Sequence, residues 1–229
     1  MSEQHPMSRR GLLAAGLGTA AGLLADRLVA APGGRECEDA TPVQTAGPFY
    51  PTRDREDEDA DLTRVNGRGG RAAGEVIHVR GRVLDVDCRP VAGAVVEIWQ
   101  ANAAGRYDHE RDAGNPRPLD PNFQGWAEVL TDAEGRYGFK TIKPGAYPAD
   151  DRGWIRPPHI HFKVSRRGYH DLVTQMYFAS EPLNEPDRIR RALAPDEREQ
   201  VTVDFRPAPQ DPEGEGRLGH FDITLRPVA

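Results

Sequence analysis

The chain has 229 residues, with 36 acidic and 30 basic side chains and a formal net charge of −6. This near balance lacks the basic stripe, interleaved with aromatic residues, by which proteins bind nucleic acid, so we expect no nucleic-acid partner. The 24 glycines and 20 prolines, against an aromatic content of 7%, favour short strands joined by many turns over a helical bundle. A chain of this length can form one large core.

Residues 1–31 are typical of an export signal. Arg9 and Arg10 precede an apolar run from Gly11 to Leu24 that is rich in Ala, Gly and Leu, as in leaders of the twin-arginine route. The run is too short and too rich in glycine for a comfortable membrane span. We therefore expect an exported protein, extracellular or in the cell envelope. A membrane tether through an uncleaved leader and an amphipathic helix kept in the cytoplasm are the alternatives.

The chain has two cysteines, Cys37 and Cys88. An even count in an exported protein favours a disulfide, with two unpaired thiols as the alternative. The bond would close a loop of about fifty residues and stabilise the fold by about 3 to 4 kcal/mol. Neither cysteine has the spacing of a metal ligand, so we do not count them in a metal site.

Residues 32–74 read as an arm followed by a loop. The stretch from Thr41 to Pro51 is punctuated by proline and glycine, which predicts an extended arm without helix. Its aromatic pair, Phe49 and Tyr50, needs a place to bury. The stretch from Arg53 to Gly74 is charged and rich in glycine, which predicts a solvated loop.

Residues 75–229 predict one all-β domain, a β-sandwich of mainly antiparallel strands with long loops. Alternating apolar and polar residues end at proline- or glycine-containing turns, and residues 132–136 predict a hairpin-type turn. One short helix is expected from Glu185 to Leu193, before Pro195. The predicted strands are 76–80, 83–87, 94–101, 125–130, 137–141, 159–165, 172–178, 201–205 and 221–225.

Two histidines in one predicted strand are the first chemical signal. Side chains two apart in a strand share a face, so His159 and His161 point together while Ile160 and Phe162 point into apolar packing. Two imidazoles on one face can bind a metal. The bare H-x-H pattern also fits a half-buried strand whose histidines are only hydrogen-bonded.

Two tyrosines upstream extend this signal. Tyr107 follows the predicted strand that contains Trp99, Tyr147 follows the one that ends near Thr141, and we expect each in a turn that reaches the strand ends. A cation can stabilise a phenolate well below its ordinary pKa of about 10. Two phenolates and two neutral imidazoles suit ferric iron, a hard ion that prefers oxygen ligands.

Several motifs in this order resemble one family. They are TPVQTAGPFYP from Thr41, GAVVEIWQAN from Gly93, GRY from Gly105, RYGFKTIKPG from Arg136, RPPHIHF from Arg156 and TQMYF from Thr174. The sequence is similar to the intradiol ring-cleavage dioxygenases, which include protocatechuate 3,4-dioxygenase and catechol dioxygenases. The resemblance runs from Thr41 to the C-terminus.

The resemblance implies a mononuclear non-haem Fe(III) and a set of residues around it. The implied iron ligands are Tyr107, Tyr147, His159 and His161. Arg156 and Gln175 match catalytic residues near the iron, and Tyr147 matches the ligand that a catechol displaces. Tyr50, Trp99 and Tyr177 match residues near the substrate pocket, although anchoring of the arm for Tyr50 and core packing for the other two are the alternatives.

The implied reaction joins a catecholic substrate and O₂ to give a muconate-type diacid. The iron would make the bound ring reactive toward O₂, and the Arg156 cation would stabilise the negative charge that develops, unless it is a structural arginine paired with a carboxylate. Ala149 stands where protocatechuate enzymes tend to have an aromatic residue, which puts protocatechuate itself in doubt. The helical dimerisation segment of catechol 1,2-dioxygenases is also missing, so neither label transfers cleanly. A homo-oligomer stays an open expectation.

Two other functions fit parts of the pattern. A non-catalytic β-sandwich module that binds a surface or a carbohydrate would use the histidines and tyrosines as an aromatic patch and would bind no iron. A zinc enzyme would use the histidine pair with a nearby carboxylate base, but tyrosines outnumber carboxylates near the motif.

Overall fold

The computed structural model describes residues 39–52, 57–208 and 216–228, which lie in one compact unit, Glu36–Ala229. The predicted leader and Cys37 lie outside the described residues. Within the described ranges no helix is long and apolar enough to cross a membrane. The account below concerns this unit alone.

The first sheet is built around its longest strand, β1. On one side β4 pairs with β1 in antiparallel fashion, and on the other side β11 and β12 pair with it in succession, both parallel. The chain crosses from β11 to β12 at Phe221, whose carbonyl lies so close to Gly81 that a Cβ would not fit there. The strands of this sheet are β1 (Val76–Asp85), β4 (Arg136–Ile142), β10 (Arg206–Pro207), β11 (Arg217–His220) and β12 (Ile223–Leu225).

The second sheet carries the histidine strand at its centre. Its order is β3-β2-β7-β8-β9, antiparallel except for the pair β8 and β9. A two-stranded ribbon of β5 (Tyr147–Pro148) and β6 (Ile155–Arg156) leads into β7. The strands of the second sheet are β2 (Val95–Trp99), β3 (Trp126–Leu130), β7 (His159–Ser165), β8 (Leu172–Phe178) and β9 (Thr202–Val203).

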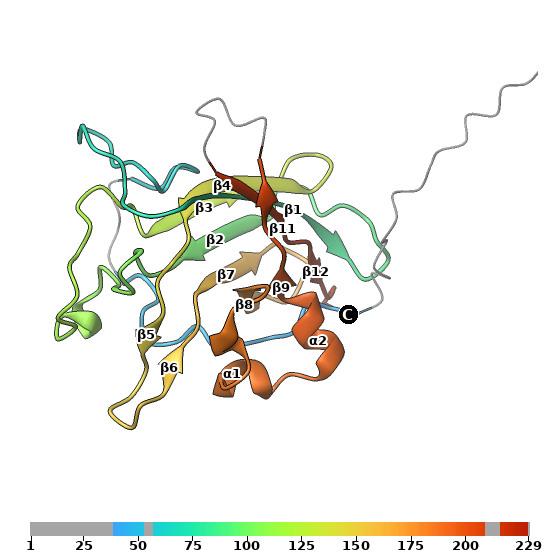
Figure 1. Cartoon of the computed structure of the whole chain (residues 1–229). Helices are drawn as coiled ribbons and strands as arrows, with labels where there is room; N and C mark the ends of the chain where they lie inside the picture. The colour runs from blue at the N-terminus through green and yellow to red at the C-terminus, as the bar shows by residue number, and fades with distance from the viewer. Residues whose placement is uncertain (1–38, 53–56, 209–215, 229) are drawn as a thin grey trace, which may run out of the picture. The chain divides into compact units, whose positions relative to one another are not determined.

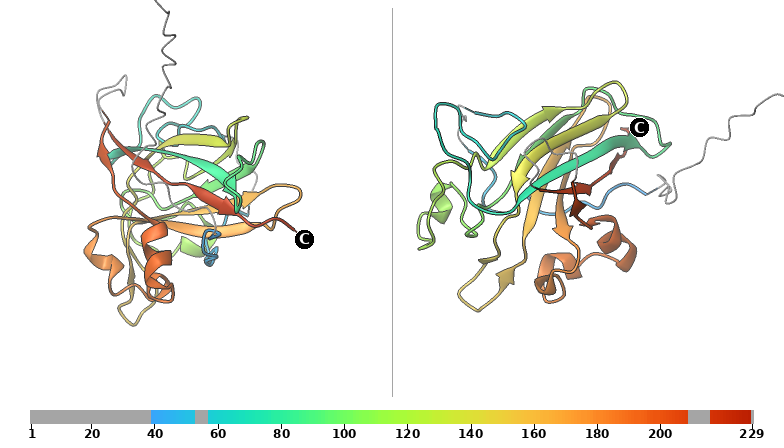
Figure 2. Two further views of the ribbon diagram at one scale, coloured as in Figure 1. Left: turned by 90° about the vertical axis from the view of Figure 1, so that its right-hand side faces the viewer. Right: turned by 45° about the horizontal axis from the view of Figure 1, so that its top comes forward.

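The two sheets enclose the main core (Figures 1 and 2). Val79 and Phe139 from the first sheet and Ile98, Ile160 and Phe162 from the second belong to one cluster and are at most 5% exposed. Burying each such side chain contributes about 1.5–3 kcal/mol. The predicted all-β sandwich is confirmed, as is the inward direction of Ile160 and Phe162, so His159 and His161 lie on the outer face of the second sheet.

Four details differ from the sequence prediction in ways that matter for the site. Tyr147 lies in the short strand β5, not in a turn, because it pairs with Arg156 of β6. The turn at residues 132–136 is present, but it joins strands of different sheets and so is no hairpin. In the expected solvated loop, Leu62 is fully buried in the core, since an apolar side chain there finds room between strands. The predicted strand 201–205 shortens to β9.

The one predicted helix is shorter in the structure, and a second helix that was not predicted follows it. Pro182–Asn184 forms the 3-10 helix η2, α1 spans only Arg188–Arg191, and α2 spans Pro195–Gln200. Pro195 follows α1, as predicted, and is also the first residue of α2, since proline fits the first helical position. Another 3-10 helix, η1, spans Glu110–Asp112, and its Asp112 carboxylate accepts a hydrogen bond from the Tyr107 backbone N–H at 2.7 Å.

Candidate active site

The two histidines meet at their ring nitrogens. His159 and His161 are 2% and 1% exposed, and their Nε2 atoms are 3.1 Å apart. The Nδ1 atom of His159 lies 2.7 Å from the carbonyl of Pro157, which fixes the direction of this ring. Trp99 of β2 lies directly opposite His161 and stacks on it, with ring centroids 4.8 Å apart at an angle of 7°.

The two tyrosines complete a cluster of rings with the histidines. Tyr107 and Tyr147 lie edge to face, with centroids 5.5 Å apart. Tyr147 lies 5.6 Å from His159, and Tyr107 lies 6.5 Å from His161, again between ring centroids. We call Tyr107, Tyr147, His159 and His161 the four-ring cluster. The fold thus brings together side chains from well-separated parts of the sequence.

Two loops make this meeting possible. The loop after β2 brings in Tyr107, and the loop after β4 brings in Tyr147. They touch at Gly105, which has φ +78° and where a Cβ would collide with the Ala146 carbonyl. Arg117 also donates a hydrogen bond to that carbonyl. The close approach of the loops therefore depends on glycine at position 105.

Burial sets the charge state of these groups. It lowers the pKa of His159 and His161 well below the ordinary value, and the nearby Arg156 cation lowers both further. Burial raises the pKa of Tyr107 well above 10, and the adjacent Tyr147 adds to this. For Tyr147 burial also raises the pKa, but Arg156 opposes the rise. The imidazoles are therefore neutral, with lone pairs free to bind a cation.

The donor set fits a hard trivalent metal ion. The buried Tyr107 hydroxyl has no hydrogen-bond partner, which costs about 1–3 kcal/mol unless a ligand satisfies it. The Nε2 atoms of His159 and His161 lie 3.1 Å apart, close enough to bind the same metal ion. Among the described residues no group of three or more His, Cys, Asp or Glu side chains could hold a metal, so a carboxylate-rich or thiolate site is not available there. Two phenol oxygens and two imidazole nitrogens suit ferric iron.

Arg156 is held in place by a buried network. Its Nε donates to Asp187 Oδ2 at 2.8 Å and its Nη2 donates to Gln175 Oε1 at 2.5 Å. The Tyr177 hydroxyl donates to Gln44 Oε1 at 2.9 Å and lies 3.3 Å from the same Gln175 oxygen. Arg156 is 3% exposed and Asp187 is fully buried, so this ion pair is shielded from solvent. Arg156 is paired with a carboxylate and also lies next to the four-ring cluster.

The arm runs across the outer face of the second sheet. Gln175 Nε2 donates to the Thr45 carbonyl at 2.8 Å. Gly47 has φ +66°, and a Cβ on it would lie 3.6 Å from His161 Cε1. Phe49 stacks on Tyr107 with centroids 4.5 Å apart, and Tyr50 lies edge to face with Trp99 at 5.0 Å. The predicted extended arm is confirmed, and its aromatic pair packs in the smaller core cluster beside the site.

Four residues around the site were not predicted from the sequence. Asp187, Glu97 and Lys163 carry charge in or near the site, and Gln44 joins the Tyr177 hydroxyl to the arm. Strand alternation could have placed Glu97 and Lys163 at the site, because they lie two residues before Trp99 and two residues after His161 and so share their face of the sheet. No sequence pattern could have placed Asp187 there, since it lies in a loop far along the chain.

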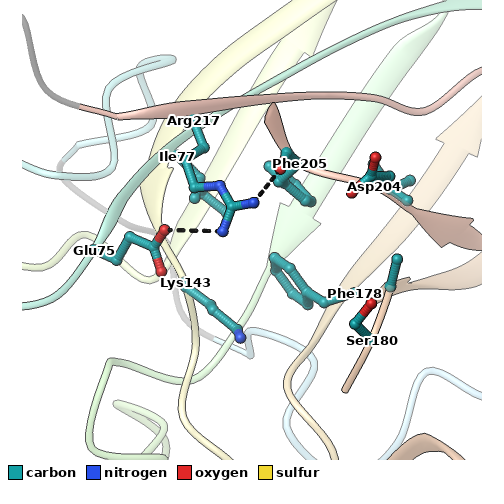
Figure 3. A pocket seen from close by; sticks show the side chains of 10 residues that line it. Glu75, Ile77, Lys143, Phe178, Ser180, Asp204, Phe205 and Arg217 are labelled. Atoms are coloured by element: carbon teal, nitrogen blue, oxygen red, sulfur yellow. Dashed lines mark hydrogen bonds and ion pairs between the residues drawn. The ribbon is translucent and has the colours of Figure 1, made fainter. Parts of the chain in front are cut away.

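A separate hollow of about 260 Å³ lies away from the four-ring cluster, at the edge where the two sheets meet. Its walls include Phe178 and Phe205 (Figure 3). Its charged groups have partners, among them Asp204, which lies 3.2 Å from Arg206. Arg217 lies 3.6 Å from Glu75 and donates to the Phe205 carbonyl, while Lys143 lies 3.5 Å from Glu181. No residue of the four-ring cluster lines this hollow.

Comparisons with known proteins show which family the chain resembles. A family model described as Dioxygenase matches residues 45–227. The protocatechuate 3,4-dioxygenase beta chain of Burkholderia cepacia is 46% identical over 184 residues, which cover 78% of this chain and 76% of that protein. A catechol 1,2-dioxygenase of Candida albicans is 38% identical over 123 residues, 48% of this chain and 39% of that protein.

The fold has solved counterparts. The dioxygenase domain of a dioxygenase carbohydrate-binding protein fusion from the cellulolytic bacterium Streptomyces sp. SirexAA-E is 29% identical, with a TM-score of 0.62, covering 83% of this chain and 100% of that chain. Fold and relatives define an oxidoreductase of the dioxygenase class. The chain belongs to the intradiol dioxygenase family, as its motifs predicted. Members of this family use non-haem iron.

Proposed function

We propose that this chain cleaves catecholic rings with O₂ by means of a mononuclear non-haem iron(III). The ring opens between its two hydroxyl-bearing carbons, both oxygen atoms enter the product, and a cis,cis-muconate-type diacid results. The observation that carries the proposal is the four-ring cluster of two tyrosines and two neutral histidines, with Arg156 fixed beside it. The identity to a protocatechuate 3,4-dioxygenase chain supports the same reaction class.

Tyr107, Tyr147, His159 and His161 would hold the iron. When bound, iron(III) would supply a Lewis acid that makes a catechol ring reactive toward O₂. The histidines need lose no proton to bind it, because burial keeps them neutral. The tyrosines must lose theirs, and the Arg156 cation favours this at Tyr147.

Tyr147 is the residue that accepts a proton from the substrate. The deprotonated Tyr147 oxygen would accept one of the two phenolic protons of an incoming catechol, and solvent would take the other. Arg156 then presents a fixed positive charge where negative charge develops on the ring. Asp187 and Gln175 hold its guanidinium in one orientation, so little reorganisation is needed. Trp99 and Tyr177 are at most 1% exposed and keep water from this wall.

Oxygen uptake with a panel of catechol, protocatechuate, hydroxyquinol and alkylcatechols tests the proposal. The iron-loaded protein is expected to consume one O₂ per ring and to form a diacid without releasing hydrogen peroxide. Ala149 stands two residues after Tyr147, where the resemblance leads us to expect an aromatic residue in protocatechuate enzymes, so alkylcatechols are expected to rank above protocatechuate. No uptake with any member of the panel would overturn the function.

A variant pair links the activity to the site. Tyr147→Phe removes the proton acceptor and is expected to lower kcat by roughly 100-fold or more while the protein stays folded. Tyr169→Phe is the control, because Tyr169 packs against the main core. Equal activity of both variants would contradict the role of Tyr147.

We also propose that the protein is exported through the twin-arginine route with a disulfide between Cys37 and Cys88. The paired Arg9 and Arg10 before an apolar run support the route. Replacing both arginines with lysine should keep the protein in the cytoplasm in a cell-fractionation assay. Alkylation without reductant should label neither cysteine of the exported protein. Export of the double-lysine variant, or two labelled thiols, would refute the respective proposal.

A further inference from the structure

Glu97 and Lys163 form a cross-strand pair beside the four-ring cluster. Glu97 of β2 lies directly opposite Lys163 of β7, and on the same face the next opposed pair is Trp99 and His161. The Lys163 Nζ donates to Glu97 Oε1 at 2.7 Å. The Lys163 side chain is 31% exposed and the Glu97 side chain 11%, so the pair is only partly accessible to solvent.

This pair holds Tyr50 of the arm. The Tyr50 hydroxyl donates a short hydrogen bond to Glu97 Oε2, and the Lys163 Nζ donates to the Tyr50 oxygen at 3.2 Å. The Lys163 Nζ also lies 5.2 Å from the centroid of the Tyr50 ring, within range of a cation–π contact. Burial and the hydrogen bond to Glu97 raise the Tyr50 pKa, so the hydroxyl keeps the proton that it donates. Three polar groups are thereby satisfied together.

The arm is therefore fastened at both ends of the stretch that crosses the site. At one end Gln44 Nε2 donates to the Gln175 carbonyl at 2.9 Å. At the other end Tyr50 is bound to Glu97 and Lys163. Between these ends lie Gly47, against the edge of His161, and Phe49, against Tyr107. A loose Tyr50 would let this middle stretch move away from two residues of the four-ring cluster.

We propose that Glu97 and Lys163 are positioning residues that clamp the arm through Tyr50 and so fix one wall of the catechol site. The clamp deepens the proposed function and rests on it for its effect on substrate. Neither residue needs to touch substrate or iron, because each acts through Tyr50. An arm held in advance costs less conformational entropy when substrate binds, so the clamp should lower KM more than it raises kcat.

The chain offers a matched control. Lys143 and Glu181 form an ion pair with similar exposure, 35% and 15%, but Lys143 lies at the separate hollow and not at the arm (Figure 3). Lys163→Met and Glu97→Gln are therefore compared with Lys143→Met and Glu181→Gln. Tyr50→Phe is the fifth variant, since it removes only the hydroxyl and keeps the ring against Trp99. Lys163→Arg retains the cation and is expected to rescue the clamp.

Two readouts are made on each iron-loaded, full-length variant. Hydrogen exchange of the peptide that contains residues 41–52 is expected to speed up by roughly tenfold in Lys163→Met, Glu97→Gln and Tyr50→Phe and to stay unchanged in the controls. The KM for catechol is expected to rise by roughly three- to tenfold in the same three variants, with kcat within about twofold. If Lys163→Met or Glu97→Gln does not fold, the hydrogen exchange and the KM of Tyr50→Phe alone test the clamp.

An unchanged hydrogen-exchange rate of this peptide in Lys163→Met and Tyr50→Phe would overturn the clamp. An equally large increase of that rate in the Lys143→Met and Glu181→Gln controls would overturn it as well. Faster exchange with an unchanged KM would overturn its role in substrate binding. If the parent protein consumes no catechol at all, the proposed function fails, while the exchange measurement still judges whether the pair holds the arm.

Discussion

Arg156 combines two roles that the sequence suggested as alternatives. It lies at the four-ring cluster, and its Nε is bound to the fully buried Asp187. Removing one member of a buried ion pair leaves the other charge without a partner, which is strongly destabilising. The carboxylate therefore sets both the position of the guanidinium and the charge that it presents to a substrate.

Asp187→Asn tests this positioning. Asp187 caps the start of α1 by accepting a hydrogen bond from the Arg190 N–H. Asparagine can still accept this hydrogen bond, so the helix cap is kept while the negative charge is lost. We expect kcat/KM to fall by roughly 10- to 100-fold, because a hydrogen bond to a charged group contributes about 1.5–3 kcal/mol. Asp196→Asn on the exposed start of α2 is the control. Steady-state oxygen uptake gives kcat/KM for both variants. An equal kcat/KM in Asp187→Asn and Asp196→Asn would show that Arg156 needs no carboxylate.

For single residues, the sequence predicts on which face of a sheet a side chain lies wherever strand alternation decides it. His159 and His161 share a face because they are two apart in a strand. Asp187 could not be predicted as a partner of Arg156, since a loop and two strands separate them and no periodicity connects the two. The role of Glu97 and Lys163 likewise depends on the arm, which pairs with them only in the folded chain.

Among the elements, the arm has the closest connection with the site. Gly47 combines a left-handed backbone with contact to the edge of His161. Gly67 has a similar φ of +77°, but a Cβ at that position would have no neighbour within 4 Å, so it isolates the backbone effect. Comparing alanine substitutions at the two glycines therefore separates the effect of backbone strain from the effect of a methyl group placed at the site.

Gly47→Ala and Gly67→Ala are expected to lose similar stability, about 1–2 kcal/mol each, because alanine is strained at positive φ. Only Gly47→Ala is expected to raise the KM for catechols, since its methyl group would face the histidine edge. Denaturant unfolding and oxygen uptake measure the two effects. A raised KM in both variants, or in neither, would contradict the arm as a wall of the site.

The turn between β3 and β4 gives a pH-dependent prediction. Hydrogen bonds from the Arg136 backbone N–H, the Arg136 side chain and the Glu134 N–H lower the pKa of Asp132. The folded pKa is therefore below the unfolded value of about 3.9, so the carboxylate stabilises the fold above that value and ceases to do so as pH falls through the folded pKa. Asp132→Asn should lower the free energy of unfolding at pH 7, and this loss should be smaller near pH 3. Urea unfolding at both pH values checks this, and an equal loss at both would contradict it.

Elements could be predicted where local pattern and tertiary contacts agree. The bounds of β7 and β8 match the prediction because alternation continues along both strands. The two-residue strands β5 and β6 exist only through their pairing with each other, so no local pattern marks them. Pro195 fits both the stretch after one helix and the start of another, and only the folded chain shows that both apply.

For the whole molecule, the fold places the reactive residues outside the core. The sandwich buries one face of the second sheet, and the other face, covered by the arm and the β5–β6 ribbon, carries the histidines. Stability and chemistry are therefore largely separated between the two faces of one sheet. Substitutions in the four-ring cluster should alter metal binding and activity while the main core keeps the protein folded.

The visible absorption spectrum of the iron-loaded protein tests the central claim most directly. Tyrosinate bound to iron(III) gives a ligand-to-metal charge-transfer band, so the protein is expected to be reddish. Tyr107→Phe and Tyr147→Phe should each shift or weaken that band, whereas Tyr169→Phe should leave it unchanged. A fully metallated but colourless protein, or a parent spectrum retained in both tyrosine variants of the cluster, would contradict the claim that these two phenols and two imidazoles hold a ferric ion.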